Sequence, residues 1–152
     1  MSKTSQRMVW IDLEMTGLDL ERESIIEIAT VITDSQLNIL ATGPNLAIKV
    51  QQELLDGMDE WNTRHHHGSG LVQRIHDEGK ELSDAEQATV QFLKEWIEPG
   101  TAPLCGNSVW NDRQFLAKEM PAVLEMLHYR MIDVSTIKEL ARRWYPKAPF
   151  YA

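Results

Sequence analysis

Two acidic side chains interrupt an apolar segment near the start of the chain. Asp12 and Glu14 stand two residues apart within residues 8–15, whose other members are mostly apolar. If this segment is a β-strand, its side chains alternate between two faces, so both carboxylates lie on the same face. Like charges on one hydrophobic face repel each other and resist desolvation, and a shared cation relieves that cost. Because both donors are carboxylate oxygens, the pattern favours an Mg²⁺ or Mn²⁺ site over an edge strand with both acids in water.

A third acid, Asp112, follows a segment that also has the pattern of a site. Residues 103–106 are expected to form a short strand, Gly-Asn-Ser at 106–108 a turn, and residues 111–120 a helix. This order would place Asp112 just past the end of a strand, at the edge where open α/β sheets bind ligands. Taken alone, Asp112 is better explained as a first-turn acid that interacts favourably with the helix dipole.

The elements that must position these acids follow from hydrophobic periodicity and turn residues. The expected strands are 8–15, 24–34, the pieces 37–40 and 46–50, 103–106 and 131–134. Gly43-Pro44 is expected to interrupt the third strand. The connections between the first three strands are too short for helical crossovers, which predicts an antiparallel meander.

Helices are expected in the remainder of the chain. Two or three short helices are expected between 51 and 77, with breaks at Gly68 and Gly70. Four further helices are expected to begin at Ser83, near Asn111, at Pro121, and at Ser135 or Thr136. Ser83 with Glu86, and Ser135 or Thr136 with Glu139, have the spacing of capping boxes. A meander followed by alternating helices and strands predicts an α/β fold whose mixed sheet combines antiparallel and parallel strands and is flanked by helices.

The amino-acid composition is that of a globular protein with an acidic net charge. The 152 residues are 43% hydrophobic and 25% charged, which is typical of one globular domain. There is no apolar run of membrane-spanning length, and a single cysteine, Cys105, fits a reducing cytoplasm. A net charge of −8 counts against a groove that holds long nucleic acid through its phosphates. It is compatible with a compact site that handles a short anionic substrate through metal ions.

Five sequence blocks, taken together, resemble the oligoribonuclease family. In chain order they are DLEMTGLD, IIEIA, WNTRHHHGSGL, CGNSVWNDRQFL and HYRMIDVSTIKELARRW, and the resemblance runs from Met8 to Trp144. It implies a DEDD-type 3′→5′ exonuclease with a ribonuclease H-like fold that hydrolyses very short RNA, especially dinucleotides, to mononucleotides. The chain departs from the family at Trp110-Asn111, where Gly-Gln is common, and this leaves the shape of that loop open.

The resemblance also implies roles for individual residues. Asp12, Glu14 and Asp112 would hold two Mg²⁺ or Mn²⁺ ions on either side of the scissile phosphate. The implied substrate-binding residues are Leu18 and Trp61 at the bases, His66 near the substrate, and Ser108, Ser135 and Thr136 around the terminal phosphate. Without the resemblance, we would interpret Trp61 as a helix-packing residue and the last two hydroxyls as helix caps.

Tyr129 and Arg130 match residues that reach into the partner's site in this dimeric family. The resemblance therefore implies a homodimer, with Tyr129 at the catalytic centre of the partner. Considered locally, alternation of Leu127, Tyr129 and Met131 is equally consistent with an ordinary core strand.

The run His65-His66-His67 raises the possibility of a metal cluster. Consecutive helical residues point about 100° apart, so we expect that these histidines do not share one ion. We expect His65 and His67 to face solvent.

The family's remaining catalytic pair is a general-base histidine and, five residues later, a fourth acid. The resemblance places this pair on a helix beyond Trp144, and we expect residues 1–152 to be a single exonuclease domain that lacks this helix. His128 and Asp133 have the same spacing, but on a strand they would face opposite sides, so we do not expect them to replace the pair. The alternatives are a DNA-proofreading exonuclease of the same fold and a non-catalytic nucleotide-binding module.

Overall fold

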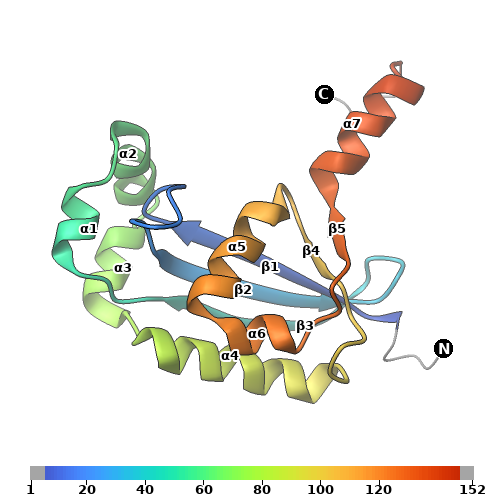
Figure 1. Ribbon diagram of the computed structural model, residues 1–152, viewed down its shortest axis with the longest axis horizontal. Helices are drawn as coiled ribbons and strands as arrows, with labels where there is room; N and C mark the ends of the chain where they lie inside the picture. Colours follow the sequence, from blue (N-terminus) through green and yellow to red (C-terminus); the bar gives the residue numbers. More distant parts are fainter. Residues whose placement is uncertain (1–5, 148–152) are drawn as a thin grey trace.

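The computed structural model describes residues 6–147, which form one five-stranded sheet flanked by helices (Figure 1). The strands are β1 (Met8–Met15), β2 (Ile25–Thr33), β3 (Ile39–Ala47), β4 (Leu104–Gly106) and β5 (Met131–Asp133). The helices are α1 (Gln52–Asp56), α2 (Glu60–Gly68), α3 (Leu71–Glu78), α4 (Leu82–Trp96), α5 (Val109–Glu119), α6 (Pro121–Glu125) and α7 (Val134–Trp144). No helix among these residues is both long and apolar enough to cross a bilayer.

The sheet is mixed, as the sequence predicts. Its strand order is β3-β2-β1-β4-β5. β1 pairs antiparallel with β2, and β2 with β3, whereas β4 lies parallel to both β1 and β5. The three-strand meander and the later parallel strands are therefore confirmed, and β1, which carries two of the acids, lies at the centre.

The core lies between the sheet and the helices α4, α5 and α6, which cover one face of it (Figure 1). Val9, Ile11 and Leu13 point into this core and are buried, whereas Asp12 is exposed and Glu14 is half-buried. This alternation confirms that the two acids share one face of β1. A second, smaller apolar cluster packs helices α1 and α3 against the start of β2 and the end of β3.

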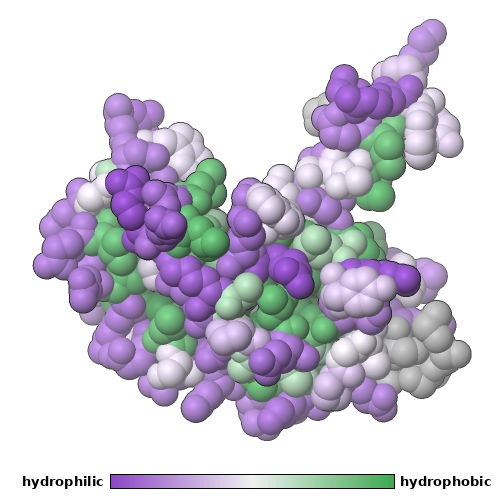
Figure 2. All heavy atoms as spheres, in the orientation of Figure 1, coloured by the Kyte–Doolittle hydropathy of each residue, from purple (hydrophilic) through white to green (hydrophobic). Residues whose placement is uncertain are grey.

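The helix α7 projects away from the body of the molecule (Figure 1). Its side chains Ile137, Leu140 and Trp144 are exposed and follow the spacing of one helical face. Figure 2 shows apolar atoms beside hydrophilic ones on this projecting helix. An apolar face of this kind is typical of a surface that contacts another protein or segment.

The third strand corrects one expectation from the sequence. β3 is continuous from Ile39 to Ala47 and passes through Gly43-Pro44, which we expected to interrupt it. β3 lies at the edge of the sheet, and its pairing with β2 shifts register at Gly43-Pro44, a position where a proline removes no regular ladder hydrogen bond. Gly43 is needed for close packing, since a Cβ atom at this position would lie 2.5 Å from a ring carbon of Phe92 on α4.

We therefore expect Gly43→Ala to lower the free energy of unfolding by about 1–3 kcal/mol, because the added methyl group overpacks the contact between β3 and α4. Gly68→Ala is the matched control. A Cβ atom at Gly68 meets no atom within 4 Å, and the position is helical, so this variant should be as stable as the wild type or slightly more so. Urea unfolding of the three proteins tests this, and equal midpoints for Gly43→Ala and wild type would contradict it.

Both expected capping boxes are wrong. α4 begins at Leu82 without a side-chain cap, and Glu86 accepts a hydrogen bond from the backbone N–H of Ala122 (2.9 Å), at the start of α6. α7 is capped by Asp133, and Glu139 pairs with Arg142 and Arg143. In both places a glutamate that could close a local capping box instead makes another contact. The expected start of a helix at Pro121 is confirmed.

Candidate active site

Three carboxylates from two elements lie near one another. Asp12 and Glu14 come from β1, and Asp112 comes from the first turn of α5, which follows β4. Because β4 pairs directly with β1, the start of α5 is held beside the two acids of β1. Burial raises the pKa of Asp112 to about 7, and the charges of Asp12, Glu14 and Asp133 contribute in the same direction.

The same crowding affects the two acids of β1. Burial raises the pKa of Asp12, and the charge of Glu27 adds to it. Burial also raises the pKa of Glu14, where His66 and His65 oppose the shift and Asp12 and Glu27 reinforce it. Oxygen donors that destabilise one another's charge are suited to a divalent cation such as Mg²⁺ or Mn²⁺, which neutralises them together.

Glu27 is a fourth acid at this site to which the sequence analysis gives no role. It lies directly opposite Glu14 across the antiparallel β1–β2 pair, so both side chains point to the same face. Arg74 of α3 forms an ion pair with Glu27 and also contacts the side chain of Asn45 (3.4 Å). The signal that could have identified Glu27 is a charged residue within an otherwise apolar strand, but its position opposite Glu14 depends on the strand register.

Leu18 and Trp61 lie together beside Glu14. They line one cavity of about 420 Å³, with Glu14, Met15, Gly17, Asp59 and Asn62 forming the rest of its wall. Leu18 is 73% exposed and Trp61 is 64% exposed, so neither is a packing residue of the core. The ring of Trp61 stacks on His65 with 4.7 Å between centroids. The arrangement offers an open apolar slot next to an acid of the metal-site candidate.

Asp133 organises the residues that the resemblance assigns to the terminal phosphate. One oxygen of Asp133 accepts hydrogen bonds from the backbone N–H of Ser108 (2.8 Å) and from the N–H and hydroxyl of Ser135 (2.9 and 2.8 Å). Desolvation acts to raise the pKa of Asp133, but these hydrogen bonds outweigh it and hold the pKa below its ordinary value. The hydroxyl of Ser135 is thus engaged with Asp133. Thr136 is exposed and borders a neighbouring hollow with Trp110, the residue that departs from the family pattern.

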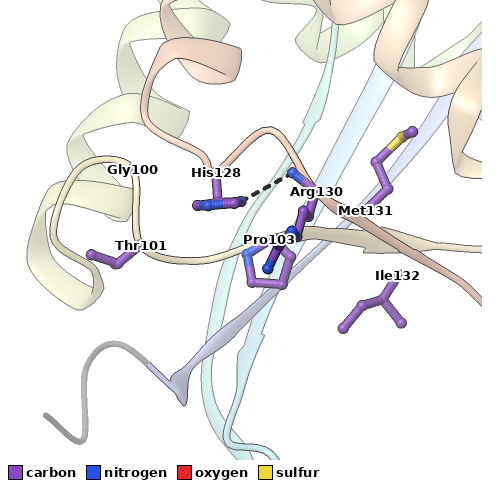
Figure 3. A pocket seen from close by; sticks show the side chains of 7 residues that line it. All are labelled: Gly100, Thr101, Pro103, His128, Arg130, Met131 and Ile132. Atoms are coloured by element: carbon purple, nitrogen blue, oxygen red, sulfur yellow. Dashed lines mark hydrogen bonds between the residues drawn. The ribbon is translucent and has the colours of Figure 1, made fainter. Parts of the chain in front are cut away.

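His128 and Arg130 line a separate pocket of about 470 Å³ beneath the start of β5 (Figure 3). Nδ1 of His128 accepts a hydrogen bond from the backbone N–H of Arg130 (3.1 Å). His128 precedes β5, whereas Asp133 is its last residue, so the expectation that both lie on the strand is wrong. Tyr129 is 70% exposed, stacks on His128, and lies beneath the guanidinium of Arg130 at 5.6 Å.

Two residues of the histidine run on α2 lie beside Glu14 of β1. His66 is fully buried, and its Nδ1 lies 4.0 Å from one carboxylate oxygen of Glu14, while Nε2 of His65 lies 3.9 Å from the other. His65 and His66 therefore approach one carboxylate although they are consecutive on the helix, and the expectation that the histidines do not share an ion stays a prediction. The two rings leave α2 in different directions, but Glu14 lies between those directions and is reached from both sides. His65 and His67 are both exposed, as expected.

Comparisons with known proteins identify the family of this chain. The exonuclease family RNase_T matches residues 9–152. The oligoribonuclease of Yersinia enterocolitica is 56% identical over 147 residues, which cover 97% of this chain and 81% of that protein. The oligoribonuclease of Xanthomonas campestris pv. campestris is 57% identical over 142 residues, which cover 93% of this chain and 73% of that protein.

Solved structures show the same fold. Exonuclease I of E. coli, in complex with an oligonucleotide, has a TM-score of 0.70 and 12% identity over 93% of this chain. This chain spans about a third of the exonuclease I chain, 31% of its length. At this identity the likeness establishes the ribonuclease H-like exonuclease fold alone. The family match and the high identity over almost the whole chain go further: the chain belongs to the oligoribonuclease family of RNase_T exonucleases.

Proposed function

We propose that this protein is a metal-dependent 3′→5′ exoribonuclease that hydrolyses very short RNA, especially dinucleotides, to mononucleotides. The observation that carries the proposal is the meeting of Asp12, Glu14 and Asp112 beside the cavity of Leu18 and Trp61. A charged centre and an apolar slot of this size suit one phosphodiester and its adjoining bases.

The residues of the site have distinct tasks in this reaction. Asp12, Glu14 and Asp112 would hold two Mg²⁺ or Mn²⁺ ions, which supply an activated water and stabilise the leaving oxygen. Trp61 offers a flat exposed face on which a base stacks, an interaction worth about 1–3 kcal/mol. Ser108 and Thr136, with the helix start organised by Asp133, would bind the terminal phosphate.

The decisive experiment compares RNA of two, four, seven and twenty nucleotides with DNA of the same lengths, at physiological salt and with saturating Mn²⁺. We expect affinity and turnover to be highest for the RNA dinucleotide and to fall as the substrate lengthens, because a chain of net charge −8 attracts polyanions weakly. Tighter binding of the twenty-nucleotide RNA than of the dinucleotide would contradict the proposal. Equal cleavage of DNA would favour a proofreading exonuclease.

We also infer a cytoplasmic location. Cys105, the chain's one cysteine, is buried, and burial raises the pKa of its thiol to about 12. A protonated, buried thiol is unreactive and forms no disulfide, which suits a reducing compartment.

We further propose that the protein acts as a homodimer in which Tyr129 and Arg130 contact the substrate of the partner subunit. Both residues are exposed and lie outside the cavity of Leu18 and Trp61, although their side chains pack on each other. The apolar face of α7, which begins directly after β5, offers the kind of surface that a dimer buries.

If Arg130 acts on the partner's substrate, Arg130→Ala should weaken dinucleotide binding at least about tenfold, because a hydrogen bond to a charged phosphate is worth roughly 1.5–3 kcal/mol. The melting temperature should stay within a degree or two of the wild type, since the side chain is exposed. Lys94→Ala, which removes an exposed charge from α4, is the control and should bind normally. A sharply lowered melting temperature with unchanged binding would identify Arg130 as a structural residue.

A further inference from the structure

Glu14 lies between other carboxylates on one side and two histidines of α2 on the other. On the side of α2, its oxygens face Nε2 of His65 at 3.9 Å and Nδ1 of His66 at 4.0 Å. One ligand atom from each of these three residues lies within 4.8 Å of the other two. Both distances exceed hydrogen-bonding range, so neither histidine makes a direct hydrogen bond to the carboxylate.

The orientation of His66 is determined by the backbone of β1. Nε2 of His66 lies 2.9 Å from the carbonyl oxygen of Met15. A carbonyl oxygen can only accept, so Nε2 carries the proton and Nδ1 carries a lone pair in the neutral ring. Histidines that bind metals are commonly held this way, with the second ring nitrogen donating to a carbonyl or a carboxylate.

Nδ1 of His66 is the feature that ordinary packing leaves unexplained. His66 is completely buried, and within residues 6–147 its Nδ1 has no hydrogen-bond partner. Burying a nitrogen without a hydrogen-bond partner is unfavourable, because the group loses its bond to water and gains none in return. The nitrogen faces the carboxylate of Glu14, so a cation between the two would satisfy both groups.

We propose that Glu14, His65 and His66 form a binding site for one late first-row transition-metal ion, for which Zn²⁺ is the representative probe. Imidazole nitrogens favour Zn²⁺, whereas Mg²⁺ and Mn²⁺ prefer oxygen donors. Two nitrogens and one carboxylate oxygen are a known ligand set for Zn²⁺ with a fourth position open to water.

The three ligand atoms must move closer together to bind one ion. Ligands of a tetrahedral Zn²⁺ lie about 2.0–2.2 Å from the metal and therefore roughly 3.4 Å from one another. The observed distances of 3.9 and 4.0 Å join the two histidines to different oxygens of Glu14, and one ligand atom from each residue lies within 4.8 Å of the other two. His66 is held in place by Met15, whereas the side chain of His65 is 45% exposed and stacks on Trp61, whose ring is itself exposed and would shift with it towards Glu14.

This site shares Glu14 with the proposed Mg²⁺ or Mn²⁺ centre, and this consequence depends on the proposed function. An ion bound by the two histidines draws Glu14 away from Asp12 and Asp112. Zn²⁺ should therefore inhibit RNA hydrolysis even at saturating Mg²⁺.

The test measures Zn²⁺ binding to the full chain by titration calorimetry, without RNA and in excess Mg²⁺. The proteins are wild type, His65→Gln, Glu14→Gln, and the control His67→Gln, which replaces the adjacent exposed histidine. We expect one Zn²⁺ per chain, at least about tenfold weaker binding in His65→Gln and Glu14→Gln, and unchanged binding in His67→Gln. The visible spectrum of bound Co²⁺ should show low-coordinate nitrogen ligation in the wild type and lose it in His65→Gln.

Equal Zn²⁺ affinity in wild type and His65→Gln would overturn the proposal, since the ion would then bind through the carboxylates alone. If His67→Gln lost as much Zn²⁺ affinity as His65→Gln, the proposal would also be overturned, because surface histidines would then be binding the ion without a defined site. Zn²⁺ binding that depends on His65 in a protein that cleaves no RNA with Mg²⁺ would support the metal site while rejecting the proposed function.

Discussion

Replacing Asp12 with Asn should lower the rate of dinucleotide hydrolysis by at least about a thousandfold, which corresponds to roughly 4 kcal/mol of transition-state stabilisation. Asp12 is the most exposed of the three clustered acids and shares a strand face with Glu14, so it is well placed to bind an ion. The neutral amide removes one negative donor while keeping the shape of the side chain. Mn²⁺ affinity, measured by titration calorimetry, should fall with the rate.

Asp77→Asn provides the matched control, because it makes the same chemical change on the exposed surface of α3. This variant should keep wild-type turnover and Mn²⁺ affinity. Unchanged Mn²⁺ affinity in Asp12→Asn would remove Asp12 from the metal site. If the histidine site proposed above exists, Asp12→Asn should also retain Zn²⁺ binding, which separates the two sites.

The metal-free protein should lose stability as the pH rises, and Asp112 should cause much of the loss. Its carboxyl group has an ordinary pKa of 3.8 in the unfolded chain, and the folded protein raises this pKa to about 7. Between these two values the folded state binds the proton more tightly than the unfolded state does. The free energy of unfolding therefore falls as the pH rises from about 4 to about 7 and is level above that range.

The expected loss from this one group is about 2–3 kcal/mol between pH 5 and pH 8, because each unit of pKa difference corresponds to 1.36 kcal/mol. Asp12 and Glu14, whose pKa values are also raised by burial, add to the same trend. Urea unfolding in the presence of a chelator at the two pH values gives the measurement.

Asp112→Asn tests the assignment, since an amide does not titrate. The metal-free variant should be more stable than the wild type at pH 8, and its stability should depend less on pH. Excess Mg²⁺ should restore the wild type at pH 8, because the cation stabilises the ionised carboxylates. A wild type equally stable at both pH values would show that burial does not raise the pKa of Asp112.

Local chemistry made several features of this protein predictable from the sequence. The alternation of Val9, Ile11 and Leu13 with the acids determines which face of β1 is buried, because side chains of a strand alternate whatever its partners are. Short connections required the first three strands to form an antiparallel meander. The order of the sequence blocks indicated the family, which the comparisons confirm.

Local rules failed where a residue had a better partner elsewhere in the fold. Glu86 fits a capping box by spacing, but in the structure it binds the start of α6. Gly43-Pro44 is typical of a break, but the pair is accommodated in an edge strand that packs against Phe92. Whether a strand lies at an edge depends on the whole sheet and is not encoded in its own residues.

The site was decided by tertiary structure. Parallel pairing of β4 with β1 brings the start of α5, and with it Asp112, beside Asp12, and the register of β2 sets Glu27 opposite Glu14. His66 reaches Glu14 and Met15 from more than fifty positions along the chain. Periodicity reports only the direction in which a side chain leaves its own element. Contacts between distant elements result from the packing of the entire chain, so the buried lone pair of His66 becomes visible only in the folded protein.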